Sequence, residues 1–188
     1  MRLHTVGREE NDMKAHETIL RSFLDYIKNE SISGILDAGS GRTSLSVITD
    51  VFPDAQVDAV VYPGDVRKLI SIAEIKAQHS NIEAIEKDIC SDTFDKEYDI
   101  VVAHLLLGEA AKFGNAFDDM LERVFALRYK YLIMIDYLED PAVRENDIRK
   151  MCDGNGLTVV YRAYVANEQP QVWDDFTGKH NFGYLIKR

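Results

Sequence analysis

The alternation of short apolar runs with amphipathic stretches constrains the fold of this chain more than any other feature. Runs rich in β-branched residues predict buried strands at residues 32–38, 56–61, 82–86, 98–103 and 131–135. Between most of them, apolar residues recur every three or four positions, which is typical of helices that bury one side. Strands that alternate with helices join through right-handed crossovers, so the sequence predicts a mostly parallel sheet.

The remaining elements complete one domain. Helices are expected over 9–29, 43–52 and 115–128, and from the starts at Asp65 and Asp140-Pro141. Two last strands, 157–164 and 183–187, have no helix between them and should pair antiparallel. The expected fold class is therefore α/β: a single doubly wound, mostly parallel seven-stranded sheet with helices on both faces and a C-terminal antiparallel hairpin. Without an internal linker, we expect one domain over 1–188, with a leading helix in 1–30 and the core in 31–188.

Charge and composition exclude several classes. The chain has 22 Lys and Arg against 32 Asp and Glu, a net charge of −10, which disfavours nucleic-acid binding. Its two cysteines, Cys90 and Cys152, form no CxxC pair, so no metal site is expected. No apolar run approaches the length of about 20 residues that spans a membrane. The N-terminal residues lack the apolar core of a secretory signal, so the sequence predicts a soluble cytoplasmic protein.

The informative motif follows the first strand. Asp37, Gly39 and Gly41 lie where a strand turns into a helix, and glycines there let a ligand approach the backbone and the helix start. A dinucleotide pattern would need glycine in place of Ser44 and an acid in place of Val61. A nicotinamide-dependent oxidoreductase is therefore disfavoured.

Residues 35–43 resemble motif I of the class I S-adenosylmethionine-dependent methyltransferases. Segments 86–89, 98–104 and 132–136 resemble further motifs of the same family, in the same order, so the resemblance covers residues 35–187. It implies S-adenosylmethionine as the cofactor. The residues expected to bind that cofactor are Asp37, Ala38, Gly39, Ser40, Gly41, Tyr62, Asp88, Ile89 and His104.

Two positions depart from the family pattern. Thr43 replaces the usual third glycine, and Val61 replaces the acid that holds the ribose. Asp65, at the next helix start, is a candidate to supply the missing carboxylate, and Tyr62 could stack on the adenine.

Catalytic candidates are His104 and Asp136, which follow the fourth and fifth strands. His104 has an ordinary pKa close to working pH and is a candidate general base; its alternative is a helix-start histidine bonded to backbone. Asp136 is expected either to hold a substrate amine or orient His104, or to cap the following turn.

The connection 165–181 is long for a hairpin loop and contains Trp173 and Asp174. We expect these two residues to contact the methyl acceptor, with the acids favouring a cationic or amine acceptor; the alternative is that Trp173 covers the sheet edge. The sequence thus predicts an enzyme that transfers a methyl group to a small-molecule or protein acceptor. The alternative is a catalytically degenerate methyltransferase-like module acting through partners, and a homo-oligomer is compatible with either.

Overall fold

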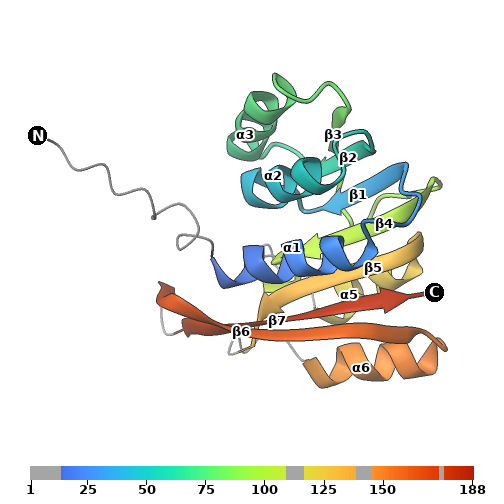
Figure 1. The fold of residues 1–188 in the computed structure, drawn as a ribbon, viewed down its shortest axis with the longest axis vertical. Coiled ribbons are helices and arrows are strands. Elements are labelled where there is room, and N and C mark those ends of the chain that lie inside the picture. The colour runs from blue at the N-terminus through green and yellow to red at the C-terminus, as the bar shows by residue number, and fades with distance from the viewer. Residues whose placement is uncertain (1–13, 109–116, 139–144, 174–175) are drawn as a thin grey trace, which may run out of the picture.

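A seven-stranded sheet with helices on both faces forms the body of the molecule (Figure 1). The computed structural model describes residues 14–108, 117–138, 145–173 and 176–188, and the side chains of 167–178 lie outside this description. The strand order is β3-β2-β1-β4-β5-β7-β6. The strands are β1 (Gly34–Ala38), β2 (Gln56–Val61), β3 (Ile82–Glu86), β4 (Glu97–His104), β5 (Arg128–Tyr137), β6 (Thr158–Trp173) and β7 (Phe176–Lys187).

Strand directions place a ligand-binding position between β1 and β4. All neighbouring pairs from β3 to β5 are parallel, whereas β7 runs antiparallel to both β5 and β6. The chain moves outward in one direction from β1 to β3 and then returns to β4 on the other side of β1, which makes this the topological switch point. Because Ala38 pairs with Ala103, the carboxyl ends of β1 and β4 lie side by side.

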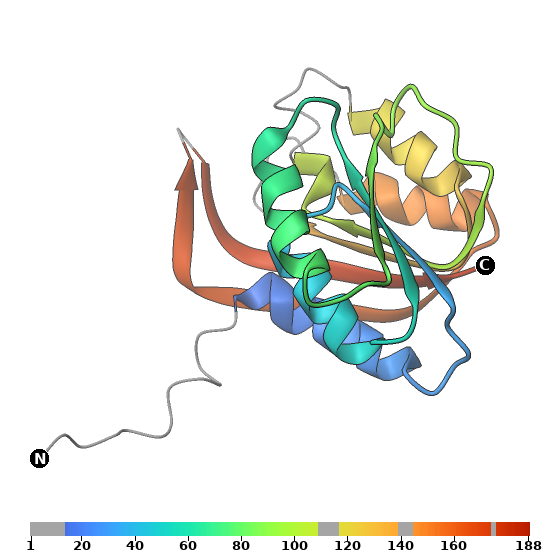
Figure 2. The same cartoon turned by 90° about the horizontal axis from the view of Figure 1, so that it is seen from above.

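Two helical layers cover the sheet (Figure 2). On one face lie α1 (Ala15–Ile27), α2 (Arg42–Val51) and α3 (Val66–Lys76). On the other lie α5 (Phe117–Ala126) and α6 (Glu145–Gly154). Each face has its own apolar core, so the central strands are buried on both sides, as a sheet between two helical layers requires.

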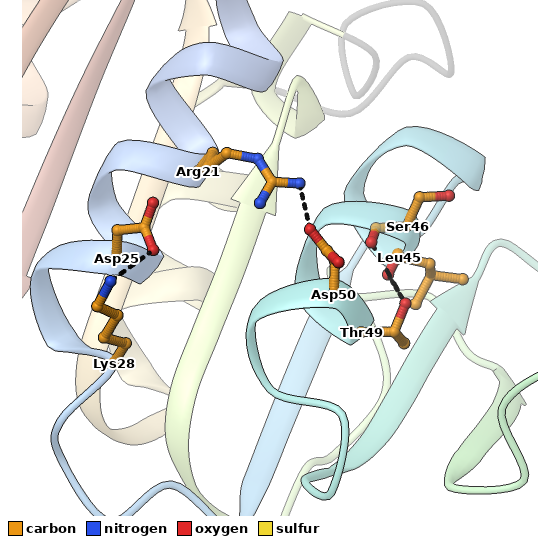
Figure 3. Close-up of polar contacts among 7 residues, drawn as sticks. All are labelled: Arg21, Asp25, Lys28, Leu45, Ser46, Thr49 and Asp50. Carbon is orange, nitrogen blue, oxygen red and sulfur yellow. Dashed lines mark hydrogen bonds and ion pairs between the residues drawn. The ribbon is translucent and has the colours of Figure 1, made fainter.

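The helix α1 crosses the sheet and reaches the antiparallel strand β7. A Cβ at Gly183 would lie 2.6 Å from Cγ2 of Ile19 and 2.8 Å from Cε2 of Phe23, so only glycine permits this close approach. On the outer side, Arg21 pairs with Asp50 of α2 at 2.6 Å (Figure 3). Such exposed ion pairs contribute little, so burial of its apolar side holds α1 in place.

The predicted fold class is confirmed, including the seven strands, the helices on both faces and the closing antiparallel pair. The strands β2 and β3 occupy the predicted residues. The expected helix starts at residues 9 and 115 and at Asp140-Pro141 lie outside the described residues. Within the described ranges, no helix has both the length and the apolar composition needed to cross a bilayer.

Most predicted boundaries shift by one or two residues, and two predictions are wrong by more. The strand β5 begins at Arg128 rather than 131, because Arg128 and Tyr129 pair with the start of β4. The expected loop 165–181 is instead mostly strand, since β6 continues to Trp173 and β7 begins at Phe176. Pairing between the two strands outweighs the low strand propensity of this segment, and an irregularity between Ala166 and Gln171 accommodates its proline.

Candidate cofactor and acceptor site

The turn between β1 and α2 has glycine in a backbone conformation that other residues adopt only with strain. Gly39 has a φ of 78°, in the left-handed region that glycine tolerates best. A Cβ there would also lie 2.7 Å from Cδ1 of Leu106, which packs against the turn from beyond β4. Ser40 donates its backbone N–H to Val60 at 2.8 Å and its hydroxyl to the carbonyl of Asp37 at 2.7 Å. Because these bonds stay within the protein, Ser40 shapes the turn.

Asp37 is the buried acid of this glycine turn. Its Oδ2 accepts a 2.6 Å hydrogen bond from the Ser44 hydroxyl, whereas Oδ1 has no hydrogen-bond partner among the described residues. Burial raises the pKa of Asp37 to about 6, against the hydrogen bonds from Ser44 and Ser40 and the charge of Lys68. A buried acceptor without a partner costs free energy, so Oδ1 is placed to accept a hydrogen bond from a ligand.

The start of α2 contributes backbone to the same turn. Gly41 is the N-cap residue, and its backbone N–H donates to the Ser44 hydroxyl at 3.3 Å. Ser44, which breaks the dinucleotide pattern, therefore connects the helix start to Asp37. Lys68 reaches the turn from α3, with Nζ 3.5 Å from the carbonyl of Gly39.

A carboxylate reaches the end of β2 from the neighbouring strand. Val61 is buried and apolar, but its register partner on β3 is Glu86, whose Oε2 accepts from the backbone N–H of Gly64 at 3.2 Å. Asp65 instead caps α3 by accepting from the Lys68 backbone at 3.1 Å. The exposed Tyr62 lies beside them in the chain. Sequence reasoning missed Glu86 because only strand register brings it to this position.

The other predicted cofactor residues have mixed environments. Ala38 and Ile89 are buried in the core on the α5 side. Asp88 is half-buried, and its carboxylate accepts from the Cys90 backbone at 2.9 Å and the Ser91 hydroxyl at 3.2 Å. Asp88 thus shapes its own loop, although a carboxylate has further lone pairs for a ligand.

His104 is the last residue of β4 and pairs with a residue of α1. Its Nε2 lies 2.9 Å from Nδ1 of His16, a hydrogen bond between two buried rings. Burial, followed by the charges of His16, Lys14 and Lys68, lowers the pKa of His104 to about 3. Burial and Lys14 lower the pKa of His16 to about 4. Both rings are neutral near pH 7, and His104 is a weaker base than an exposed histidine.

Asp136 holds the chain that follows β4. Its Oδ2 accepts from the backbone of Leu107 at 3.0 Å and Gly108 at 3.1 Å, and Oδ1 accepts from the Tyr137 backbone at 2.9 Å. Just before them, Leu105 has a φ of 56°, a strained conformation for a non-glycine residue. Asp136 therefore supports the strained exit from β4 beside His104.

The carboxyl edge contains a further polar residue that the sequence did not indicate. Asn181 of β7 is fully buried and pairs in register with Tyr137. Its Nδ2 donates to the carbonyl of Asp136 at 3.4 Å, while Oδ1 has no partner within the described part of the chain. For Trp173 the structure describes only the backbone, in β6 opposite Phe176, and Asp174 lies outside the described residues.

A cavity of about 570 Å³ lies at the opposite, amino-terminal edge of the sheet. It is lined by residues at the starts of β1, β2, β4 and β5 together with Arg188. It is therefore separate from the glycine turn. Among the described residues, no group of three His, Cys, Asp or Glu side chains could hold a metal ion.

Comparison with known proteins identifies the fold. No family model and no curated protein matches the chain by sequence. A proposed RNA methyltransferase from Pyrococcus horikoshii superposes with a TM-score of 0.68 at 17% identity, over 92% of this chain and 82% of its own. The N-methyltransferase NodS from Bradyrhizobium japonicum, crystallised with S-adenosyl-L-homocysteine, gives 0.66 at 13% identity, over 92% and 85%.

A third match is magnesium protoporphyrin IX methyltransferase from Synechocystis PCC 6803 with bound S-adenosylmethionine. Its TM-score is 0.63 at 17% identity, over 93% of this chain and 80% of its own. At such identities the likeness establishes the fold. The chain has the fold of the S-adenosylmethionine-dependent methyltransferases, as the sequence motifs implied.

Proposed function

We propose that this chain binds S-adenosylmethionine at the glycine turn and transfers its methyl group to a small molecule. The observation that carries this proposal is Oδ1 of Asp37, a buried acceptor without a partner at the switch point of an α/β sheet. Structural neighbours crystallised with this cofactor or its product support it. Two neighbours are named for small-molecule acceptors, 1,6-didemethyltoxoflavin and magnesium protoporphyrin IX.

The residues present fit such a cofactor. Oδ1 of Asp37 would accept a hydrogen bond from a donor at the methionine end of the cofactor, and Gly39 would let the cofactor approach the backbone. Glu86 would accept hydrogen bonds from the ribose hydroxyls in place of the missing acid at Val61, and Asp88 would accept one from the adenine amino group. When bound, S-adenosylmethionine supplies an electrophilic methyl group on a sulfonium, with a thioether as the leaving group.

The chain's own contribution is positioning. Methyl transfer requires the acceptor atom, the methyl carbon and the sulfur to lie in line. A protein that holds them in this arrangement lowers the entropic part of the barrier. His104 lies at the carboxyl end of β4, one strand from the glycine turn. Because burial lowers the pKa of His104, its ring is neutral near pH 7 and places no charge beside the acceptor.

Calorimetric titration with S-adenosyl-L-homocysteine tests the cofactor assignment. We expect the wild type to bind, Asp37→Asn to bind about 10- to 100-fold more weakly, and Glu86→Ala about tenfold more weakly, as loss of a hydrogen bond to a charged group predicts. Glu83→Ala, an exposed change on the same strand as Glu86, should bind as the wild type does. If the folded wild-type protein does not bind this ligand, the proposal is overturned and a non-catalytic binding module is favoured.

A further inference from the structure

Polar side chains follow the carboxyl edge of the sheet on the face that α1 covers. Strand side chains alternate between faces, and Ile100 and Val102 of β4 belong to the core under α1, so His104 faces the same way. By the same alternation, Ile135 places Tyr137 on this face, and Leu185 places Asn181 there. The ring centroids of Tyr137 and His16 are 6.5 Å apart, which confirms that α1 lies over this row.

The packing of α1 on β7 places His16 and Asn181 toward the same edge of the sheet. Ile19 packs at the position of Gly183, and from there the preceding residues of both elements lead toward the carboxyl edge. One helical turn before Ile19 is His16, and two residues before Gly183, on the same face of β7, is Asn181. The first turn of α1, which holds His16 against His104, therefore lies over the same face and edge as Asn181.

Asn181 requires a hydrogen-bond donor that the described chain does not supply. Its exposure is 0%, and the bond from Nδ2 to the carbonyl of Asp136 fixes which amide atom is the nitrogen. The remaining oxygen is buried without a partner. Like Oδ1 of Asp37, it accepts hydrogen bonds and cannot donate them, so the group that satisfies it must carry an N–H or O–H.

The nearby lysines disfavour a cationic donor. The two histidines are neutral, and each loses basicity through the nearby charge of Lys14 as well as through burial. Lys68 acts on His104 in the same direction. Burying an ammonium ion among neutral rings and near two cations would be unfavourable, because neither ring supplies a compensating charge. A neutral hydroxyl or aromatic amine satisfies the same oxygen without that cost.

We propose that Asn181, His16 and His104 bind the methyl acceptor, and that this acceptor is an uncharged molecule with a hydroxyl or aromatic amine. The hydrogen of that group is donated to Oδ1 of Asn181, and the His16–His104 pair lies beside it under α1. His16 is a positioning residue, because its bond to Nε2 fixes the ring of His104. The identification of the ligand as the methyl acceptor rests on the proposed function. The binding site itself is inferred from the buried oxygen of Asn181 and the two histidines on the same face of the sheet.

The test compares phenol and aniline with anisole, which has the same ring but no donor. In ¹⁵N-labelled wild-type protein, phenol and aniline should shift the side-chain amide of Asn181 and the imidazole nitrogens of His16 and His104. Anisole, and the cation benzylammonium, should leave these signals in place. Equal shifts with phenol and anisole, or phenol shifts confined to other residues, would overturn the inference.

Matched variants separate this result from the cofactor assignment. Asn181→Leu keeps the side-chain volume, removes the oxygen and should weaken phenol binding about tenfold. Asn155→Leu, an exposed change after α6, should not weaken it. If Asn181→Leu fails to fold, the contrast of phenol with anisole in the wild type decides alone. Titration of the same sample with S-adenosyl-L-homocysteine reports on the cofactor site: binding of that ligand without a phenol response overturns only the acceptor inference.

Discussion

The two edges of the sheet treat the same kind of side chain in opposite ways. At the amino-terminal edge, one carboxylate oxygen of Asp99 accepts three hydrogen bonds, from the backbone and hydroxyl of Ser33 and the backbone of Gly34, at 2.7 to 3.0 Å. At the carboxyl edge, Asp37 is fully buried, and one of its oxygens has no partner among the described residues. The first arrangement is complete, whereas the second leaves a place for a ligand.

The pKa values of Asp99 and Asp37 are shifted in opposite directions. Burial raises the pKa of Asp99, but the hydrogen bonds from Ser33 and Gly34 together lower it below its ordinary value. For Asp37 burial prevails, and the pKa rises to about 6. The carboxylate of Asp99 therefore stabilises the fold, while that of Asp37 destabilises it until a ligand arrives. Binding sites keep such unfavourable groups because the ligand satisfies them.

The largest expected effect on stability comes from adding a side chain at the carboxyl edge. Gly39→Ala adds a methyl group 2.7 Å from Leu106 in a backbone conformation that alanine disfavours. We expect it to lower the free energy of unfolding by about 2–4 kcal/mol, the sum of conformational strain and overpacking. Urea denaturation measures this change.

Gly156→Ala is the matched control, because Gly156 has a φ of 65° with open space around its position. It should cost only the conformational part, about 1–2 kcal/mol. Equal losses of stability in the two variants would mean that the Leu106 side chain moves aside and that the turn is not closely packed.

Replacing the aspartate at each edge by asparagine should change the free energy of unfolding in opposite directions. Asp37→Asn removes a buried charge and should raise the free energy of unfolding at pH 8 by about 1–3 kcal/mol, since its pKa is shifted by about two units. Asp99→Asn replaces an acceptor of three hydrogen bonds and should lower that free energy by about 1–2 kcal/mol. Chemical denaturation of both variants at pH 8 measures the contrast.

The pH dependence of Asp37→Asn follows from the direction of the shift. The pKa rises from 3.8 to about 6 on folding, so between these values the folded state binds more protons than the unfolded state. The penalty is fully present above pH 6 and disappears below about pH 4. The stabilising effect of Asp37→Asn should shrink over that window; a gain that is independent of pH would contradict a buried ionised carboxylate.

Most of the fold, and the position of the glycine turn, could be predicted from sequence because both depend on local patterns. Hydrophobic periodicity located β2 and β3, and the glycine turn was evident from Asp37 and Gly39 beside a strand. The closing hairpin was predicted, but its length was not, because residues near its tip have low strand propensity and become strand only by pairing with each other.

The sequence singled out His104, but the partners around it could not be predicted because they are distant in sequence. His16 and His104 are 88 positions apart, and nothing local to α1 distinguishes His16 from other residues of an amphipathic helix. Asn181 fell in the expected loop, where a buried amide has no signature. The packing of α1 against β7 at Gly183 places the first turn of α1 at the same edge of the sheet as Asn181.

The last prediction concerns these histidines and appears as a dependence of stability on pH. Their pKa values fall from 6.5 to about 4 for His16 and about 3 for His104, so below pH 6.5 the unfolded chain binds protons that the folded chain does not. Stability should therefore decrease as pH falls from 6.5 toward 4, by up to about 1.4 kcal/mol per pH unit for each histidine.

His16→Gln should remove one of these two contributions, while His79→Gln, a change outside the buried pair, should retain the full slope. Denaturation curves collected at intervals from pH 7 to pH 4 measure the slopes. Because Asp37 acts in the opposite direction between pH 6 and pH 4 in all three proteins, the difference between variants isolates the histidine term. Parallel curves for the wild type and His16→Gln would show that burial does not keep this pair neutral.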